Sequence, residues 1–169
     1  MDVFQEAEML RKVPIFGGLD PAKLKLLAFT SRSLKFAPGE VLMRVNEPAD
    51  SAYVIIEGEA EVLADSGAGE FVVATLGKNE SIGEMGVIQN VPRGATVRAK
   101  TPVRALRIAG DVFLRLLTDN PDCALYVMRD LSKRVAAANK RLGAAVRESE
   151  SLRAQLREAQ AKTGRDAPA

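Results

Sequence analysis

The sequence contains no histidine and a single cysteine, Cys123, among its 169 residues. Without histidine, the chain lacks both the commonest general base and the commonest ligand of protein metal sites. One thiol cannot form an internal disulfide, a cysteine-rich zinc site or an iron–sulfur cluster. We therefore expect Cys123 to be a small buried residue on a helix, and we expect no enzyme activity, no metal and no cofactor.

Long hydrophobic runs are also missing from the sequence. No apolar run approaches the roughly 18 residues that a membrane-spanning helix needs. The early carboxylates Asp2, Glu6 and Glu8 differ from the basic start of a secretory signal. We therefore expect a cytoplasmic protein that does not bind a membrane. The 24 basic and 22 acidic residues leave a net charge of +2, which favours no class of charged partner.

The first two thirds of the chain divide into a short helical part and a β-rich part. Within residues 1–32, Asp20 followed by Pro21 is typical of a helix start, with a capping carboxylate and proline in the first turn. Residues 33–109 form many short apolar runs separated by glycine, proline and asparagine. This spacing indicates a mainly β protein, an antiparallel jelly-roll barrel flanked by helices.

The last part of the chain is expected to be helical over residues 110–162, with a disordered tail at 163–169. We expect Leu125 and Met128 to pack inward on the barrel. Beyond them, a heptad pattern predicts a coiled-coil homodimer, in which Glu148 would face Arg153 of a parallel partner. The seam consists of apolar residues with one serine, at alternating steps of three and four: Met128, Leu131, Val135, Ala138, Leu142, Ala145, Ser149, Leu152, Leu156 and Ala159.

The residues best suited to bind a ligand lie in the segment between residues 81 and 97. Arg93 offers a planar fork that suits two phosphate oxygens, and the small Gly94 and Ala95 leave backbone N–H groups open to an anion. Gly83 permits unusual backbone angles, and an ionised Glu84 accepts hydrogen bonds, as a sugar hydroxyl requires. Taken singly, Arg93 also fits a surface charge and Glu84 an acidic turn residue, so these residues alone leave the function open.

The same run resembles the phosphate-binding cassette of the cyclic-nucleotide-binding domain family, which reads Gly-Glu, a gap, and then Pro-Arg followed by small residues. The resemblance places the cassette at residues 82–96 and covers about Leu10 to Arg134. It implies that the protein is a sensor of cAMP, or of cGMP. Gly94 replaces the threonine typical of cGMP-preferring members, which favours cAMP. The cassette residues implied in ligand binding are Gly83, Glu84, Met85, Arg93, Gly94 and Ala95, and those lining the base pocket are Val73 and Leu76.

The resemblance also extends to the helix after Asn120-Pro121, which is similar to the lid helix of the bacterial cAMP-responsive regulators in this family. By that similarity Arg134 would contact Glu84, and Asn139 would reach the adenine amine, although Asn139 also fits a polar surface position. Those regulators continue into a DNA-reading helix-turn-helix that has no counterpart in this sequence, so we expect no specific DNA binding. We expect the long helix to pass ligand occupancy to an unknown downstream protein. A structural scaffold that binds cAMP weakly or not at all, or a sensor of a cyclic dinucleotide, remains an alternative.

Overall fold

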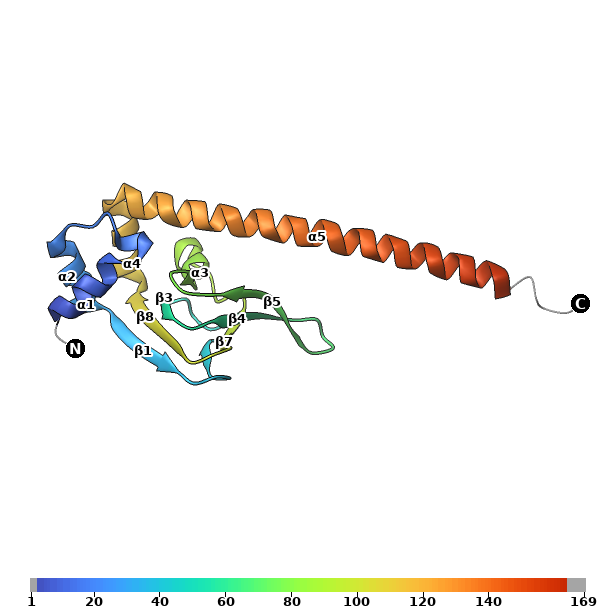
Figure 1. The fold of residues 1–169 in the computed structure, drawn as a ribbon, viewed down its shortest axis with the longest axis horizontal. Coiled ribbons are helices and arrows are strands. Elements are labelled where there is room, and N and C mark those ends of the chain that lie inside the picture. Colours follow the sequence, from blue (N-terminus) through green and yellow to red (C-terminus); the bar gives the residue numbers. More distant parts are fainter. Residues whose placement is uncertain (1–2, 164–169) are drawn as a thin grey trace, which may run out of the picture. The chain divides into compact units, whose positions relative to one another are not determined.

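The computed structural model describes residues 3–163, and two four-stranded antiparallel sheets form its β-rich part (Figure 1). One sheet has the strand order β1-β8-β3-β6 and the other β2-β7-β4-β5. This arrangement confirms the predicted mainly β fold with flanking helices. The strands are β1 (Arg32–Phe36), β2 (Val41–Met43), β3 (Ser51–Glu57), β4 (Ala60–Asp65), β5 (Glu70–Leu76), β6 (Ser81–Ile82), β7 (Thr96–Ala99) and β8 (Val103–Ala109).

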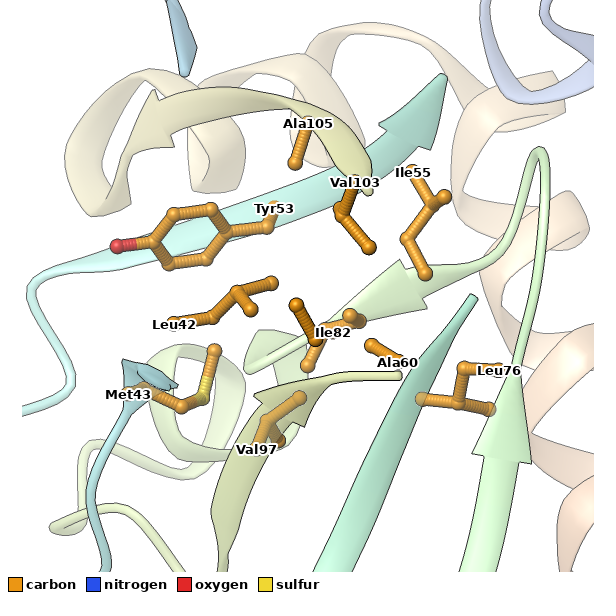
Figure 2. Close-up of a cluster of buried hydrophobic side chains, with 11 residues drawn as sticks. Leu42, Met43, Tyr53, Ile55, Ala60, Leu76, Ile82, Val97, Val103 and Ala105 are labelled. Atoms are coloured by element: carbon orange, nitrogen blue, oxygen red, sulfur yellow. The ribbon is translucent and has the colours of Figure 1, made fainter. Parts of the chain in front are cut away.

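The core lies between the two sheets, because each sheet turns an apolar face toward the other. Tyr53 and Ile55 enter it from β3, while Leu42 and Met43 enter it from β2 of the opposite sheet (Figure 2). Strand β3 is buried along its length except at Glu57, which explains why its sequence is a continuous apolar run rather than an alternating one. Buried contacts across both sheets therefore fix the strands from which the cassette extends.

Two short helices precede the sheets, α1 (Val3–Arg11) and α2 (Pro21–Thr30), with a 3-10 turn between them at Pro14–Phe16. The predicted cap of α2 is confirmed, since Asp20 Oδ1 accepts hydrogen bonds from the backbone N–H groups of Ala22 and Lys23 at 3.0 and 2.9 Å. Such a cap stabilises a helix by about 1 kcal/mol. The two helices gather beside one end of the sheets, where α2 contacts β8 (Figure 1).

The chain turns helical after β8, first in α4 (Gly110–Asp119) and then in α5 (Pro121–Thr163). Cys123 is buried as predicted, and Val127 is buried one turn later. The expectation that Leu125 and Met128 pack inward is wrong, since they are 41% and 56% exposed. The buried pair is spaced by four residues, so the inward face of this first part of α5 differs from the face that the heptad pattern marks.

The structure divides within α5 into two compact units, one through Met128 and one from Arg129 onward. In the second unit the helix exposes most of the large apolar residues of the predicted seam, among them Leu142 at 64% and Leu156 at 59%. Helical structure continues through Thr163, the first residue of the predicted tail, and residues 164–169 lie outside the described residues. No helix between residues 3 and 163 is long and apolar enough to cross a membrane.

Candidate functional site

The predicted cassette begins at a sharp connection between β6 and the short helix α3 (Glu84–Gln89). β6 is held to β3 through the pairs Tyr53–Ile82 and Val54–Ser81. Gly83 links β6 to α3 in the left-handed conformation, with φ of 78°. The sequence pattern does not reveal these two elements, because a strand of two residues and a helix of six are too short to show a hydrophobic period.

Gly83 cannot be replaced without moving the cassette arginine. A Cβ atom at this position would lie 2.4 Å from Nη1 of Arg93 and 2.9 Å from Cε of Met43. Gly86 is required for a related reason, since its Cβ would lie 2.7 Å from Cβ of Ala49. The two glycines of this motif therefore let the backbone of α3 approach the arginine and the preceding loop closely.

Arg93 is 4% exposed, so it is not a surface charge, the alternative that its sequence position left open. Its Nη1 donates to the carbonyl oxygen of Gly83 at 2.9 Å, and its Nη2 donates to the carbonyl oxygen of Ser51 at 2.7 Å. Its backbone is also fixed, because its N–H donates to the carbonyl of Glu47 and its carbonyl accepts from Asn46, both at 2.8 Å. A buried guanidinium oriented in this way is prepared to bind an anion.

Three residues outside the cassette complete the surroundings of Arg93, and the sequence analysis missed them. Nη2 of Arg93 also donates to the hydroxyl of Ser51 at 3.2 Å and lies 3.6 Å from Oδ1 of Asp50. The other carboxylate oxygen of Asp50 accepts from Nη2 of Arg107 on β8 at 2.8 Å. Ser51 lies 42 positions from Arg93 in the sequence, and Asp50 lies 57 positions from Arg107. No local pattern could therefore have revealed these contacts.

Glu84 follows Gly83 directly and is the first residue of α3, with 1% of its surface exposed. A carboxylate is rarely buried to this degree unless it is paired, so its burial distinguishes it from an ordinary acidic turn residue. Arg93 donates a hydrogen bond to the carbonyl oxygen of Gly83, the residue directly before Glu84. A hydrogen-bond acceptor and a guanidinium close to one backbone turn would suit the hydroxyl and the phosphate of a ribose phosphate.

Gly94 and Ala95 follow the arginine and precede β7. A Cβ atom at Gly94 would have no neighbour within 4 Å, so the backbone there faces open space. No turn, loop or cap hydrogen bond within residues 3–163 uses the N–H group of either residue. Their N–H groups are therefore suited to the anion-binding role that the small side chains predicted.

The remaining predicted site residues lie on three different elements. Leu76 on β5 packs into the core, whereas Val73 on the same strand is 36% exposed and Met85 on α3 is 53% exposed. Arg134 and Asn139 belong to α5 in the second unit, where Arg134 pairs with Asp130 at 2.7 Å. The contacts of Arg134 with Glu84 and of Asn139 with a base therefore stay predictions, as does the lining of a base pocket by Val73 and Leu76.

Comparison with known proteins identifies the family to which this chain belongs. The family model of the cyclic nucleotide-binding domain matches residues 33–120, just over half of the chain, and the chain belongs to this family. A cAMP-dependent protein kinase regulatory subunit of Yarrowia lipolytica is 36% identical over 108 residues, covering 64% of this chain and 28% of the relative. A CRP-like cAMP-activated global transcriptional regulator of Mycobacterium tuberculosis is 26% identical over 136 residues, covering 80% of this chain and 61% of the relative.

The fold is shared with solved structures as well. A cAMP-binding acyltransferase from Mycobacterium smegmatis superposes with a TM-score of 0.71 at 29% identity, covering 80% of this chain and 42% of that chain. The chain spans only 28% and 61% of the length of the two curated relatives named above. Family membership thus identifies a cyclic nucleotide-binding domain, which is similar both to regulators and to a cAMP-binding acyltransferase.

Proposed function

We propose that the cassette binds cAMP in preference to cGMP and that the protein acts as a sensor rather than an enzyme. The observation that carries this proposal is the buried Arg93, whose guanidinium donates hydrogen bonds to the carbonyl oxygens of Gly83 and Ser51, with the buried Glu84 next to Gly83 in the chain. The cAMP-binding relatives support the choice of ligand. Arg93 binds the cyclic phosphate, Glu84 accepts from the ribose hydroxyl, and the N–H groups of Gly94 and Ala95 donate to the phosphate.

The proposed preference for cAMP rests on what Gly94 lacks. A side-chain hydroxyl at this position could bond the amine of guanine, and glycine offers none. cGMP therefore binds with the phosphate and ribose contacts alone. The proposed sensor is cytoplasmic and does not read DNA sequence, and its ligand occupancy reaches an unknown downstream protein through α5.

Calorimetric titration with cAMP, cGMP and a cyclic dinucleotide tests this function. We expect cAMP to bind more tightly than cGMP, and we expect Arg93→Lys to weaken both by at least about tenfold, because lysine keeps the charge and loses the fork. Arg98→Lys is the matched control, since Arg98 lies five residues later and pairs with Glu61 at 3.2 Å. Its affinity should equal that of the wild type.

Thermal unfolding of each variant separates loss of binding from loss of the fold. Folded wild-type protein that gives no heat with either cyclic mononucleotide would contradict the proposal. In that case heat with the cyclic dinucleotide would identify a different anionic ligand, and no heat with any of the three would favour a scaffold.

We further propose that α5 pairs with a second copy in parallel through its exposed seam. Val135, Leu142, Leu152 and Leu156 are each more than half exposed, which costs free energy unless a partner covers them. In a parallel pair the g position Glu148 meets the e position Arg153 of the partner with opposite charge. Light scattering should report a dimer, and Leu142→Glu should shift it to a monomer, whereas Ala137→Glu, away from the seam, should not.

A further inference from the structure

The carboxylate of Asp50 lies between two arginines, only one of which belongs to the cassette. Its Oδ2 accepts a hydrogen bond from Nη2 of Arg107 at 2.8 Å. Its Oδ1 accepts from the hydroxyl of Ser51, also at 2.8 Å, and lies 3.6 Å from Nη2 of Arg93. The last distance is within reach of an ion pair but too long for a hydrogen bond, so Asp50 is hydrogen-bonded to Arg107 and Ser51 and not to the cassette arginine.

This arrangement matters because Asp50 and a bound phosphate would compete for hydrogen bonds from the guanidinium of Arg93. Arg93 already donates to Gly83 and Ser51, but its Nε donates no hydrogen bond to any residue from 3 to 163. Asp50 is 65% exposed in its side chain, so little packing prevents its carboxylate from moving. A carboxylate that moved onto Arg93 would form the paired hydrogen bonds that an anionic ligand otherwise forms.

The hydrogen bond from Arg107 to Asp50 opposes a movement of this carboxylate toward Arg93. It is 28% exposed in its side chain and lies on β8, a central strand that pairs with both β1 and β3. Its cross-strand neighbour on β1 is Arg32, a second positive charge. Because like charges opposite one another repel, the negative charge of Asp50 is the favourable partner for Arg107.

We propose that Arg107 is a positioning residue that raises nucleotide affinity by holding Asp50 away from Arg93. This inference rests on the proposed binding of a cyclic nucleotide at Arg93. Arg107 contacts no ligand atom in this role and acts through Asp50. Removal of its charge releases the carboxylate, which then competes with the phosphate for the guanidinium.

Calorimetric titration with cAMP of the full chain tests the proposal through a double-mutant cycle. Arg107→Gln should weaken cAMP binding by roughly three- to fivefold, the range expected for one partly exposed charge pair. In the Asp50→Asn background, Arg107→Gln should leave the affinity unchanged, because the competing charge is gone. Arg107→Lys should restore most of the wild-type affinity, because the ammonium can still hold the carboxylate.

Arg104→Gln is the matched control, since Arg104 lies three positions earlier on β8 and pairs with Glu57 at 2.6 Å. It should keep wild-type affinity. A purely structural role for Arg107 would instead lower affinity equally with and without the Asp50→Asn change, and that result would overturn the proposal. Unchanged affinity in Arg107→Gln, with wild-type protein binding cAMP, would also overturn it and leave the proposed function standing. Failure of the wild type to bind cAMP would overturn both.

Discussion

At the scale of single residues, the site depends on backbone freedom at Gly83. We predict that Gly83→Ala weakens cAMP binding by at least about tenfold, because its Cβ would lie 2.4 Å from Nη1 of Arg93 and displace the guanidinium. Alanine at a φ of 78° also costs about 1–2 kcal/mol of stability. Calorimetry and thermal unfolding measure the two effects separately.

Gly67 provides the control for that backbone cost. It has a similar φ of 81°, but a Cβ there would have no neighbour within 4 Å. Gly67→Ala should therefore lose comparable stability and keep wild-type affinity. If the two alanine variants bound cAMP equally well, the steric argument for Gly83 would be wrong.

The buried thiol of Cys123 leads to a second prediction at this scale. Burial raises the pKa of the Cys123 thiol, and the neighbouring carboxylate of Asp122 raises it further. The thiol is 1% exposed and contacts the carbonyl oxygen of Ile15 at 3.1 Å. We expect a thiol-reactive disulfide reagent at pH 8 to modify the native protein far more slowly than the protein in denaturant, because the thiolate is the reactive form. Equal rates would show that this part of α5 opens readily.

At the scale of elements, the first turns of α5 should be stabilised by Val127 rather than by Leu125. Val127 is 2% exposed, and Val127→Ala should lower the free energy of unfolding by about 2 kcal/mol. Leu125→Ala removes a larger side chain but should cost less than about 1 kcal/mol, because Leu125 is 41% exposed. Denaturant unfolding without nucleotide measures both, and the reverse order would contradict the observed face of the helix.

The same helix shows where a sequence pattern succeeds and where it fails. Local signals predicted the cap at Asp20, the strand runs and the burial of Cys123, because each depends on neighbouring residues. The expectation that Leu125 and Met128 pack inward was wrong, because the face of a helix that packs on a sheet is decided by tertiary contacts rather than by neighbouring residues.

The site was predictable in its cassette and not in its surroundings. Arg93, Glu84 and Gly83 could be proposed as site residues because they are close in the sequence and form a recognisable motif. Asp50, Ser51 and Arg107 were missed because their contacts with one another and with Arg93 arise from pairing between β3 and β8 and from the loop before β3. Such contacts depend on the register of strands, which no short pattern encodes.

At the scale of the whole molecule, the buried apolar core ends at Val127, before the second unit begins. We predict that a chain ending after Arg134 unfolds cooperatively, within a few degrees of the melting temperature of the monomeric Leu142→Glu variant. It should be monomeric by light scattering, because the exposed seam from Val135 onward is gone. Loss of cooperative unfolding would show that the second unit supports the barrel.

The length of α5 has a mechanical consequence. The part of α5 from Arg129 to Thr163, at about 1.5 Å per residue, is roughly 52 Å long. For a straight helix of that length, a tilt of about 5° at its first turn carries the last turn through about 5 Å, close to one helical pitch. In the proposed sensor, a small change in the direction of this part of the helix would therefore become a displacement at Thr163 that a distance label could register.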